Sequence, residues 1–287
     1  MIEAKVIADS INEHETRLIT FQVTAPKFID AELRTHRMLS QNSSSDRAIP
    51  FSKMKTKSFY VPEDVRKNQK GMQGYEKITD QQLVDFQQDL DMILDGTILN
   101  LSHWENIIHK QHLNRYLLGY SMQSKVITGT EWKNFFNLRL AADAQPEIQE
   151  VARMMKEAMD ASTPQRLKIG EWHLPYVEDP TKTIQNTYNL EEAIKMSAAR
   201  CARVSYGNHD GTDPDVEKDL KLYDFLVSSG HLSPLEHQAT PMQMMEFDTI
   251  NDVSPTTWEK GVSHIDVNFA LWSGTFKDWI QYRKMVE

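Results

Sequence analysis

The sequence contains little of what several common enzyme classes require. It has one cysteine, Cys201, which excludes an internal disulfide framework and a four-cysteine metal site within one chain. No G-x-G occurs, so the glycine-rich fingerprint of a dinucleotide-binding Rossmann fold is missing. Redox chemistry in this chain would therefore need a cofactor that is held in another way.

Long apolar runs and an excess of positive charge are missing as well. No run approaches the roughly 18 residues of a membrane span, and the opening MIEAKVIADS lacks the features of a signal peptide. We therefore expect a cytoplasmic protein. The net charge of −9 argues against a membrane surface or duplex DNA as the main partner, because both repel an acidic chain.

What is present predicts an α+β protein of 287 residues, within reach of one large domain. Periodicity predicts a hairpin over 2–8 and 19–23, a polar surface segment over 60–82, and helices over 26–37, 83–94, 102–120 and from Pro146. Capping patterns predict a helix after Asn189 and another that begins at Asp213 and ends at Gly230. We expect the helices to form a packed layer.

Residues 36–47, HRMLSQNSSSDR, concentrate recognition chemistry. The planar fork of arginine suits phosphate oxygens, and Ser and Asn side chains with turn amides can complete an anion site. A solvated Ser-rich turn between two arginines would have the same composition. The order of the residues separates these alternatives.

That order resembles the signature of the flavin-dependent thymidylate synthases, the ThyX family, written RHRxxSxNxxSxR. The matching positions are His36, Arg37, Ser40, Asn42, Ser45 and Arg47, while Thr35 stands where the family has its first arginine. The resemblance implies FAD contacts for His36, Arg37 and Asn42, and dUMP contacts for Ser45 and Arg47.

Residues 134–148 resemble a second region of the family, NFLNLR…HAQWEI. This resemblance implies that Arg139 is the catalytic residue, which orients the uracil of dUMP and favours its ionisation at N3, and that Asn134 contacts FAD. Arg115, within LNRYLL, resembles the arginine that binds the dUMP phosphate. Thr128 and Thr130 replace an expected Asn and Arg, so flavin contacts there must differ in detail.

A third resemblance lies in an unexpected place. Residues 198–205 and 230–237 resemble the N-terminal ARVS…GHxTPxEH segment of the family, yet they stand near the end of this chain. The connectivity therefore resembles a circular permutation. The implied FAD contacts are Ser205, His231, Ser233 and Glu236.

Residues 273–283 resemble a second copy of the junction that precedes the signature in the family. In this copy Gln281 and Arg283 imitate a Gln and an Arg whose places are taken by Glu32 and Thr35 in the first copy. We therefore expect Gln281 and Arg283 to contact dUMP. The alternative is an amphipathic tail that only packs.

Together these resemblances imply one ThyX-like α+β domain over 1–287, with a largely antiparallel sheet, a helical layer and permuted connectivity. Its parts would be 1–160 (signature and nucleotide), 161–188 (connection) and 189–287 (permuted flavin part). The implied reaction is reductive methylation of dUMP to dTMP by a homotetramer with FAD, NADPH and 5,10-methylenetetrahydrofolate. Cys201, beside alanines in a predicted helix, is expected to be a small buried residue and not a nucleophile.

Three alternatives remain at this stage. A related enzyme could transfer another one-carbon unit, such as hydroxymethyl, or accept another pyrimidine nucleotide. A metal-dependent hydrolase would use His103, His109 and His112, or His231, Glu236 and His237, although no spacing matches a zinc signature, so we predict no metal. A single-stranded RNA-binding module would use Arg34, Arg37 and Arg47 with Phe51, Phe59 and Tyr60.

Overall fold

The central sheet has the strand order β3-β4-β2-β1-β5, and its neighbours are antiparallel except for the β1–β5 pair. The computed structural model describes residues 1–71, 73–177, 188–205, 214–243, 255 and 258–287. The strands are Glu3–Ile11 (β1), Arg17–Pro26 (β2), Ser40–Ser43 (β3), Met122–Gly129 (β4), Gln165–Arg166 (β5), Ala239–Pro241 (β6), His264–Ile265 (β7), Leu271–Ser273 (β8), Phe276–Lys277 (β9) and Trp279–Gln281 (β10).

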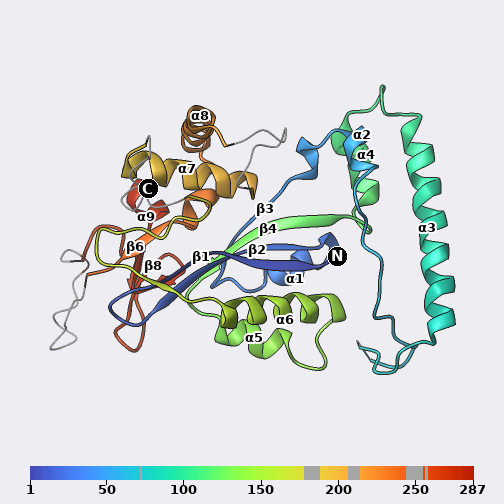
Figure 1. Ribbon diagram of the computed structural model, residues 1–287, viewed down its shortest axis with the longest axis horizontal. Coiled ribbons are helices and arrows are strands. Elements are labelled where there is room, and N and C mark those ends of the chain that lie inside the picture. Colours follow the sequence, from blue (N-terminus) through green and yellow to red (C-terminus); the bar gives the residue numbers. More distant parts are fainter. Residues whose placement is uncertain (72, 178–187, 206–213, 244–254, 256–257) are drawn as a thin grey trace.

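Helices lie on both sides of this sheet (Figure 1). The α-helices are Asp30–Leu33 (α1), Phe51–Met54 (α2), Asp80–Ser102 (α3), Lys110–Leu113 (α4), Lys133–Arg139 (α5), Pro146–Ala161 (α6), Leu190–Arg203 (α7), Val216–Ser228 (α8) and Tyr282–Val286 (α9). Short 3-10 helices are Lys27–Ile29 (η1), Asp46–Ala48 (η2), Asn114–Leu117 (η3) and Ser233–Glu236 (η4).

The main core lies between the sheet and α5–α6. One face of α6 is fully buried against β1 and β2, because its apolar residues recur at helical spacing. Phe21 of β2 meets Trp132 edge to face, with ring centroids 5.1 Å apart. On the opposite face of the sheet, Cys201 of α7 and Val204, which caps the end of α7, pack against Val126 of β4. The sheet is thus covered on both faces, and the predicted α+β architecture with a helical layer is confirmed.

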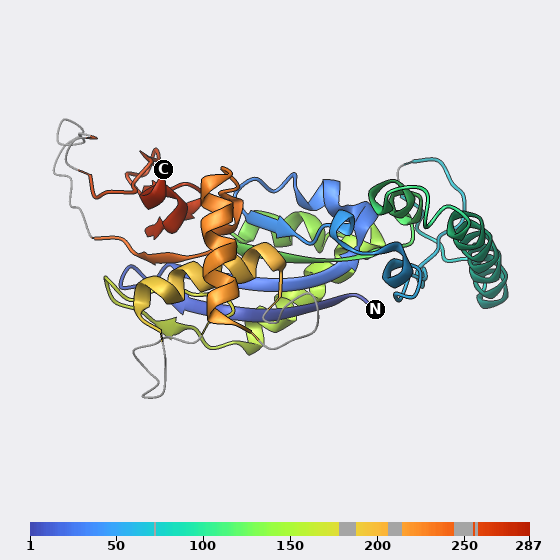
Figure 2. The ribbon, with the colours of Figure 1, turned by 90° about the horizontal axis from the view of Figure 1, so that it is seen from above.

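Two groups of elements flank the sheet at opposite ends (Figures 1 and 2). At one end α3 packs through Leu94 against Leu113 and Leu117, together with α2. At the other end β6 pairs with β10, and β8 pairs with β7 and β9. The described C-terminal residues at this end therefore lie beside the turn of the central hairpin, where Asn12 and Thr16 donate hydrogen bonds to Asp278.

Local signals predicted several elements correctly. The hairpin is confirmed as β1 and β2, and α7 begins with the expected capping box of Asn189 and Glu192. The helix that precedes Gly230 ends in a Schellman motif, because the Gly230 N–H donates to Val227 and the His231 N–H to Leu226. Among the described helices, none is both long and apolar enough to cross a bilayer.

Four helix predictions were wrong in extent. The helix expected over 83–94 is the longer α3, Asp80–Ser102. The helix expected over 26–37 ends at Leu33, and residues 102–120 form only the short α4 and η3. The helix expected from Asp213 begins at Val216, where Asp215 caps it by accepting from the Lys218 N–H. Asp213 itself lies outside the described residues.

Candidate active site

A cavity of about 250 Å³ lies at the end of the signature segment and brings together three predicted dUMP contacts. Its lining residues are Lys27, Ser45, Asp46, Arg47, Gln111, Asn114, Arg115 and Leu118. Arg47 and Arg115 are exposed, and no carboxylate among the described residues pairs with either guanidinium. The site therefore offers two uncompensated cations to an anionic ligand.

The signature segment is fixed to this cavity by a residue that sequence reasoning missed. Asn114 is buried, and its side-chain amide donates to the carbonyl oxygens of Asp46 (2.8 Å) and Ile49 (3.0 Å). Lys27, also missed, pairs with the Asp46 carboxylate. The only sequence feature that could have indicated a role for Asn114 is its position directly before Arg115. These contacts fix the segment that carries Arg47 to the segment that carries Arg115, and both arginines line the cavity.

A second part of the site surrounds Arg139, at the end of α5. Its Nε donates to His36 Nε2 (2.8 Å) and its Nη1 pairs with Glu32 Oε2 (3.0 Å). Its Nη2 donates to the Glu32 carbonyl oxygen (3.3 Å) and to Thr35 Oγ1 (3.2 Å). The predicted catalytic arginine is thus directed at the start of the signature segment, where Glu32 and Thr35 depart from the family pattern.

His36 lies between Arg139 and the aromatic core. Its ring meets Phe135 edge to face at 4.9 Å, and burial first and the Arg139 charge second lower the pKa of His36 below its ordinary value. Because Nε2 accepts from Arg139, the neutral ring carries its proton on Nδ1. His36 therefore orients Arg139.

A third part of the site joins the signature strand to the displaced C-terminal segments. Asn42 of β3 donates to the Cys201 carbonyl oxygen (3.0 Å) and accepts from Ser233 Oγ (3.4 Å). Gln281, which is buried, donates to Ser40 Oγ (3.2 Å) and to the Glu236 carbonyl oxygen (3.1 Å). Residues that are far apart in sequence thus meet along β3.

Arg283 forms an ion pair with the Glu236 carboxylate. Glu236 was predicted to contact FAD and Arg283 to contact dUMP, and the two side chains are neighbours. The proposed roles of Gln281 and Arg283 as dUMP contacts stay predictions. Neither residue lines the cavity that contains Arg47 and Arg115.

The other predicted FAD contacts are dispersed. Arg37, Asn134 and His231 are exposed to solvent. Ser205 lines a different cavity of about 430 Å³ beside Tyr176. Within one chain, the described residues do not bring these four side chains into a single cavity with Asn42.

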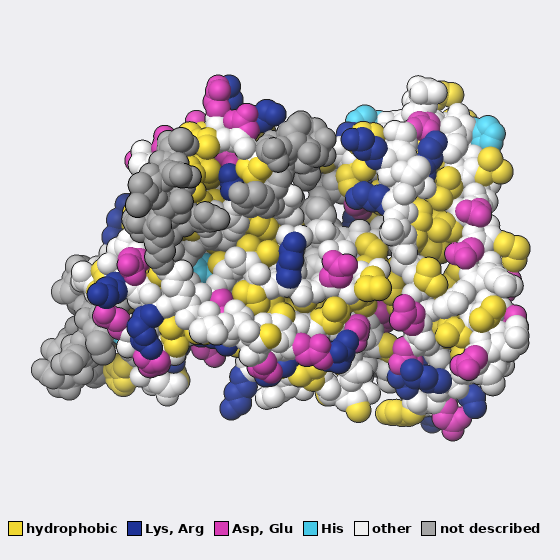
Figure 3. Space-filling view, viewed as in Figure 1, with side chains coloured by type: hydrophobic (Ala, Val, Ile, Leu, Met, Phe, Trp, Pro, Cys, Tyr) yellow, Lys and Arg dark blue, Asp and Glu magenta, His cyan; other side chains and the backbone are white. Residues whose placement is uncertain are grey.

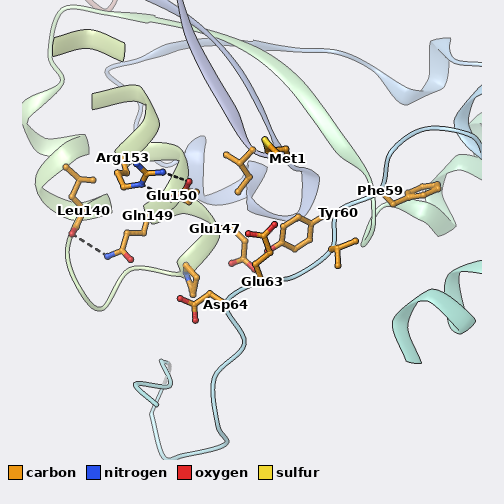
Figure 4. Close-up of a pocket in the computed structure, with 13 residues that line it drawn as sticks. Met1, Phe59, Tyr60, Glu63, Asp64, Leu140, Glu147, Gln149, Glu150 and Arg153 are labelled. Carbon is orange, nitrogen blue, oxygen red and sulfur yellow. Dashed lines mark hydrogen bonds and ion pairs between the residues drawn. The ribbon is translucent and has the colours of Figure 1, made fainter. Parts of the chain in front are cut away.

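A cavity of about 660 Å³ contains none of the residues predicted to bind dUMP or FAD (Figure 4). It lies between the loop at residues 59–64 and the start of α6, and the Tyr60 hydroxyl donates to Glu147 Oε1 (3.0 Å) at its wall. Burial first, and the carboxylate of Glu147 second, raise the pKa of Tyr60 above its ordinary value. The face of the molecule seen in Figure 3 carries interspersed acidic and basic side chains.

A chain of buried hydrogen bonds crosses the sheet near the third part of the site. His173 bonds to Thr20 Oγ1 through Nε2 (2.8 Å), Thr20 bonds to Thr128 (2.8 Å), and Thr128 bonds to His237 Nδ1 (2.8 Å). Burial lowers the pKa of both histidines to about 3. Thr128, which replaces an asparagine of the family, is therefore a structural member of this chain.

Cys201 is buried, and burial raises the pKa of its thiol far above the ordinary value, so a reactive thiolate is disfavoured. No group of three His, Cys, Asp or Glu side chains among the described residues is placed to hold a metal ion.

Residues 8–165 match the family described as thymidylate synthase complementing protein. The flavin-dependent thymidylate synthase of Thermosipho africanus (strain TCF52B) is 31% identical over 150 residues, which cover 48% of this chain and 63% of the relative. The enzyme of the same description from Pyrococcus furiosus is 26% identical over 156 residues, covering 53% and 57%. The chain therefore spans less than two thirds of the length of these relatives.

A solved structure is also similar, the UMP/dUMP methylase PolB from Streptomyces cacaoi bound with 5-Br UMP. The similarity has a TM-score of 0.46 at 16% identity, and it covers 55% of this chain and 88% of PolB.

Proposed function

The chain belongs to the thymidylate synthase complementing protein family, and on that premise we propose that it is a flavin-dependent thymidylate synthase that methylates dUMP to dTMP. The proposed co-substrates are NADPH and 5,10-methylenetetrahydrofolate, and FAD is the proposed redox carrier. One observation carries the proposal: the signature segment contacts the predicted ring-binding arginine at His36 and shares a cavity with the predicted phosphate-binding arginine.

The cavity of Arg47 and Arg115 suits the phosphate of a nucleotide. Two guanidinium forks, the Ser45 hydroxyl and the Gln111 amide supply donors for phosphate oxygens, and the Lys27–Asp46 pair leaves no free carboxylate to repel them. Such donors fix the position of the nucleotide but carry no chemistry. We assign Arg47 and Arg115 to phosphate binding.

Arg139 suits the pyrimidine ring. Its guanidinium is half-buried and oriented by His36, so it can donate to a ring oxygen and stabilise charge that develops there when C5 reacts. No thiol is required for this activation, in agreement with the burial of Cys201. Arg139 is therefore the residue that we propose as catalytic.

The chemistry of the remaining donors fits FAD. A guanidinium (Arg37), amides (Asn42, Asn134) and a hydroxyl (Ser233) are groups that can hold a diphosphate and the polar edge of a flavin ring. When bound, the reduced flavin would supply the hydride that converts the transferred one-carbon unit to a methyl. The exposure of Arg37 and Asn134 supports a cofactor held between subunits of a homotetramer.

The proposal is tested by purification and nucleotide titration. We expect a yellow protein with the absorbance of oxidised flavin, whose spectrum changes on addition of dUMP. Arg47→Ala and Arg115→Ala should each weaken dUMP binding by tenfold or more, since a charge-assisted hydrogen bond contributes about 1.5–3 kcal/mol. Arg166→Ala, an exposed arginine paired with Glu15, is the matched control.

Unchanged dUMP affinity in both cavity variants would refute the phosphate assignment. A colourless protein that retains RNA would favour the RNA-binding alternative over the enzyme. That alternative is weakened by Phe51, which is 2% exposed and cannot stack on a base without unfolding α2.

A related methylase or hydroxymethylase of pyrimidine nucleotides is the second candidate. The observation that favours it is that Glu32 and Thr35, which replace a Gln and an Arg of the family pattern, contact Arg139 directly. A change at these two positions would alter which pyrimidine ring or one-carbon unit the site accepts.

A further inference from the structure

The carboxylate of Glu32 forms an ion pair with Arg139, the residue proposed to contact the pyrimidine ring. An arginine side chain has five N–H donors. In Arg139 four of them are engaged, by His36 Nε2, Glu32 Oε2, the Glu32 carbonyl oxygen and Thr35 Oγ1. The fifth is on Nη1, beside the Glu32 carboxylate. A ligand therefore meets a donor and an acceptor side by side.

The surrounding charges leave this pair close to neutral. Asp30, on the same helix as Glu32, is matched by Lys125 of β4 and by Arg34. His36 is held neutral because burial and Arg139 lower its pKa. Arg37 is exposed to solvent. A ring bound at Arg139 thus meets one guanidinium and one carboxylate, whose charges cancel.

Resting on the proposed function, we propose that Glu32 is a positioning residue that makes the Arg139 site bind the neutral, N3-protonated edge of uracil. The Glu32 carboxylate accepts from N3–H while the free N–H of Arg139 donates to the adjacent ring carbonyl. Each of these two contacts therefore pairs a hydrogen-bond donor with an acceptor. A ring that has lost its N3 proton instead places a negative charge against the carboxylate, which opposes its binding.

This arrangement differs from a site built on a guanidinium alone. A bare arginine attracts an ionised ring, whereas a carboxylate beside it selects the protonated ring. Hydrogen bonding of N3–H to Glu32 still shifts electron density toward the ring, so C5 can be activated without full ionisation. A glutamine at position 32, the residue that the family resemblance gives, would remove the opposing charge and keep the side-chain volume.

The test compares two nucleotides that differ in the acidity of N3. Fluorine at C5 withdraws electrons and lowers the pKa of N3–H, so 5-fluoro-dUMP ionises at a pH where dUMP stays neutral. The flavin-loaded protein is titrated with each nucleotide from neutral to mildly alkaline pH, and dissociation constants are taken from the flavin spectrum. We expect the affinity for 5-fluoro-dUMP, relative to that for dUMP, to fall as its ring ionises.

The variant Glu32→Gln should remove that fall and strengthen binding of the ionised analogue by about tenfold, because a charge a few ångströms away is deleted at a partly exposed site. Glu157→Gln is the matched control, a glutamate in an exposed pair with Arg153, and should behave as the unmodified protein.

If the affinity of the unmodified protein for 5-fluoro-dUMP rises with pH, the inference is overturned while the proposed function stands. If the protein binds flavin and neither nucleotide, the proposed function itself fails and the inference fails with it. The pH series on the unmodified protein decides the question even if Glu32→Gln does not fold.

Discussion

Gln281 joins the end of the chain to the signature strand, and its replacement by alanine should destabilise the protein measurably. Its side chain is 2% exposed and donates two hydrogen bonds, to Ser40 Oγ (3.2 Å) and to the Glu236 carbonyl oxygen (3.1 Å). Its backbone N–H donates to Ser273 Oγ (3.0 Å) and is unaffected by the change.

The expected loss can be worked from these contacts. Each hydrogen bond contributes about 1 kcal/mol net, and an unsatisfied buried partner adds to that loss. The Glu236 carbonyl loses this donor, whereas Ser40 keeps Thr275 Oγ1 at 2.9 Å. The space left by the removed atoms adds a cavity cost. We therefore expect Gln281→Ala to lower the free energy of unfolding by about 2–4 kcal/mol.

Urea denaturation followed by circular dichroism measures this change. Gln281→Glu keeps the volume but replaces the donor by a buried carboxylate, so it should be at least as destabilising at neutral pH. Gln88→Ala, an exposed glutamine on α3, is the control and should change the free energy of unfolding by less than about 0.5 kcal/mol. A Gln281→Ala protein that matches this control would refute the structural role of the C-terminal strand.

Three further outcomes are expected. Arg139→Ala should abolish nucleotide methylation while flavin stays bound, and normal turnover of that variant would remove its catalytic role. Cys201→Ala should retain activity, and a folded but inactive variant would indicate a cysteine mechanism. The burial of His173 and His237 lowers the pKa of each to about 3, so each imidazole is neutral in the folded state and binds a proton on unfolding. The free energy of unfolding should therefore fall as pH decreases from about 6.5 toward 3, by about 1.4 kcal/mol per pH unit for each histidine. In His237→Phe this slope, from urea midpoints across that range, should be roughly halved, and an unchanged slope would argue against the buried neutral state.

Elements governed by local chemistry were predictable from the sequence. Alternating residues specified the β1–β2 hairpin, and the side-chain caps at Asn189 and the left-handed glycine at Gly230 fixed helix ends. The segment 102–120 was predicted as one helix because its composition favours helix. In the structure His109 caps the start of a separate helix, α4, and Leu113 and Leu117 pack against Leu94. Tertiary packing therefore overrides the helical preference of this segment.

The candidate site was predictable only where residues stand close in sequence or match a known pattern. The resemblance selected Arg47, Arg115 and Arg139, and two of these share a cavity. It could not reveal that Glu32 would engage Arg139, since 107 positions separate them. The buried chain from His173 to His237 was equally invisible, because each member is an ordinary polar residue until the sheet assembles.

The domain division, the permuted order and the homotetramer remain predictions. The most direct test of the central claim is the mass of the nucleotide recovered after dUMP, 5,10-methylenetetrahydrofolate and NADPH are incubated with the flavin-loaded protein. We predict a product that carries one additional methyl group, formed only when all three substrates are present. A nucleotide recovered unchanged, or one that carries a hydroxymethyl group, would contradict thymidylate synthesis by this chain.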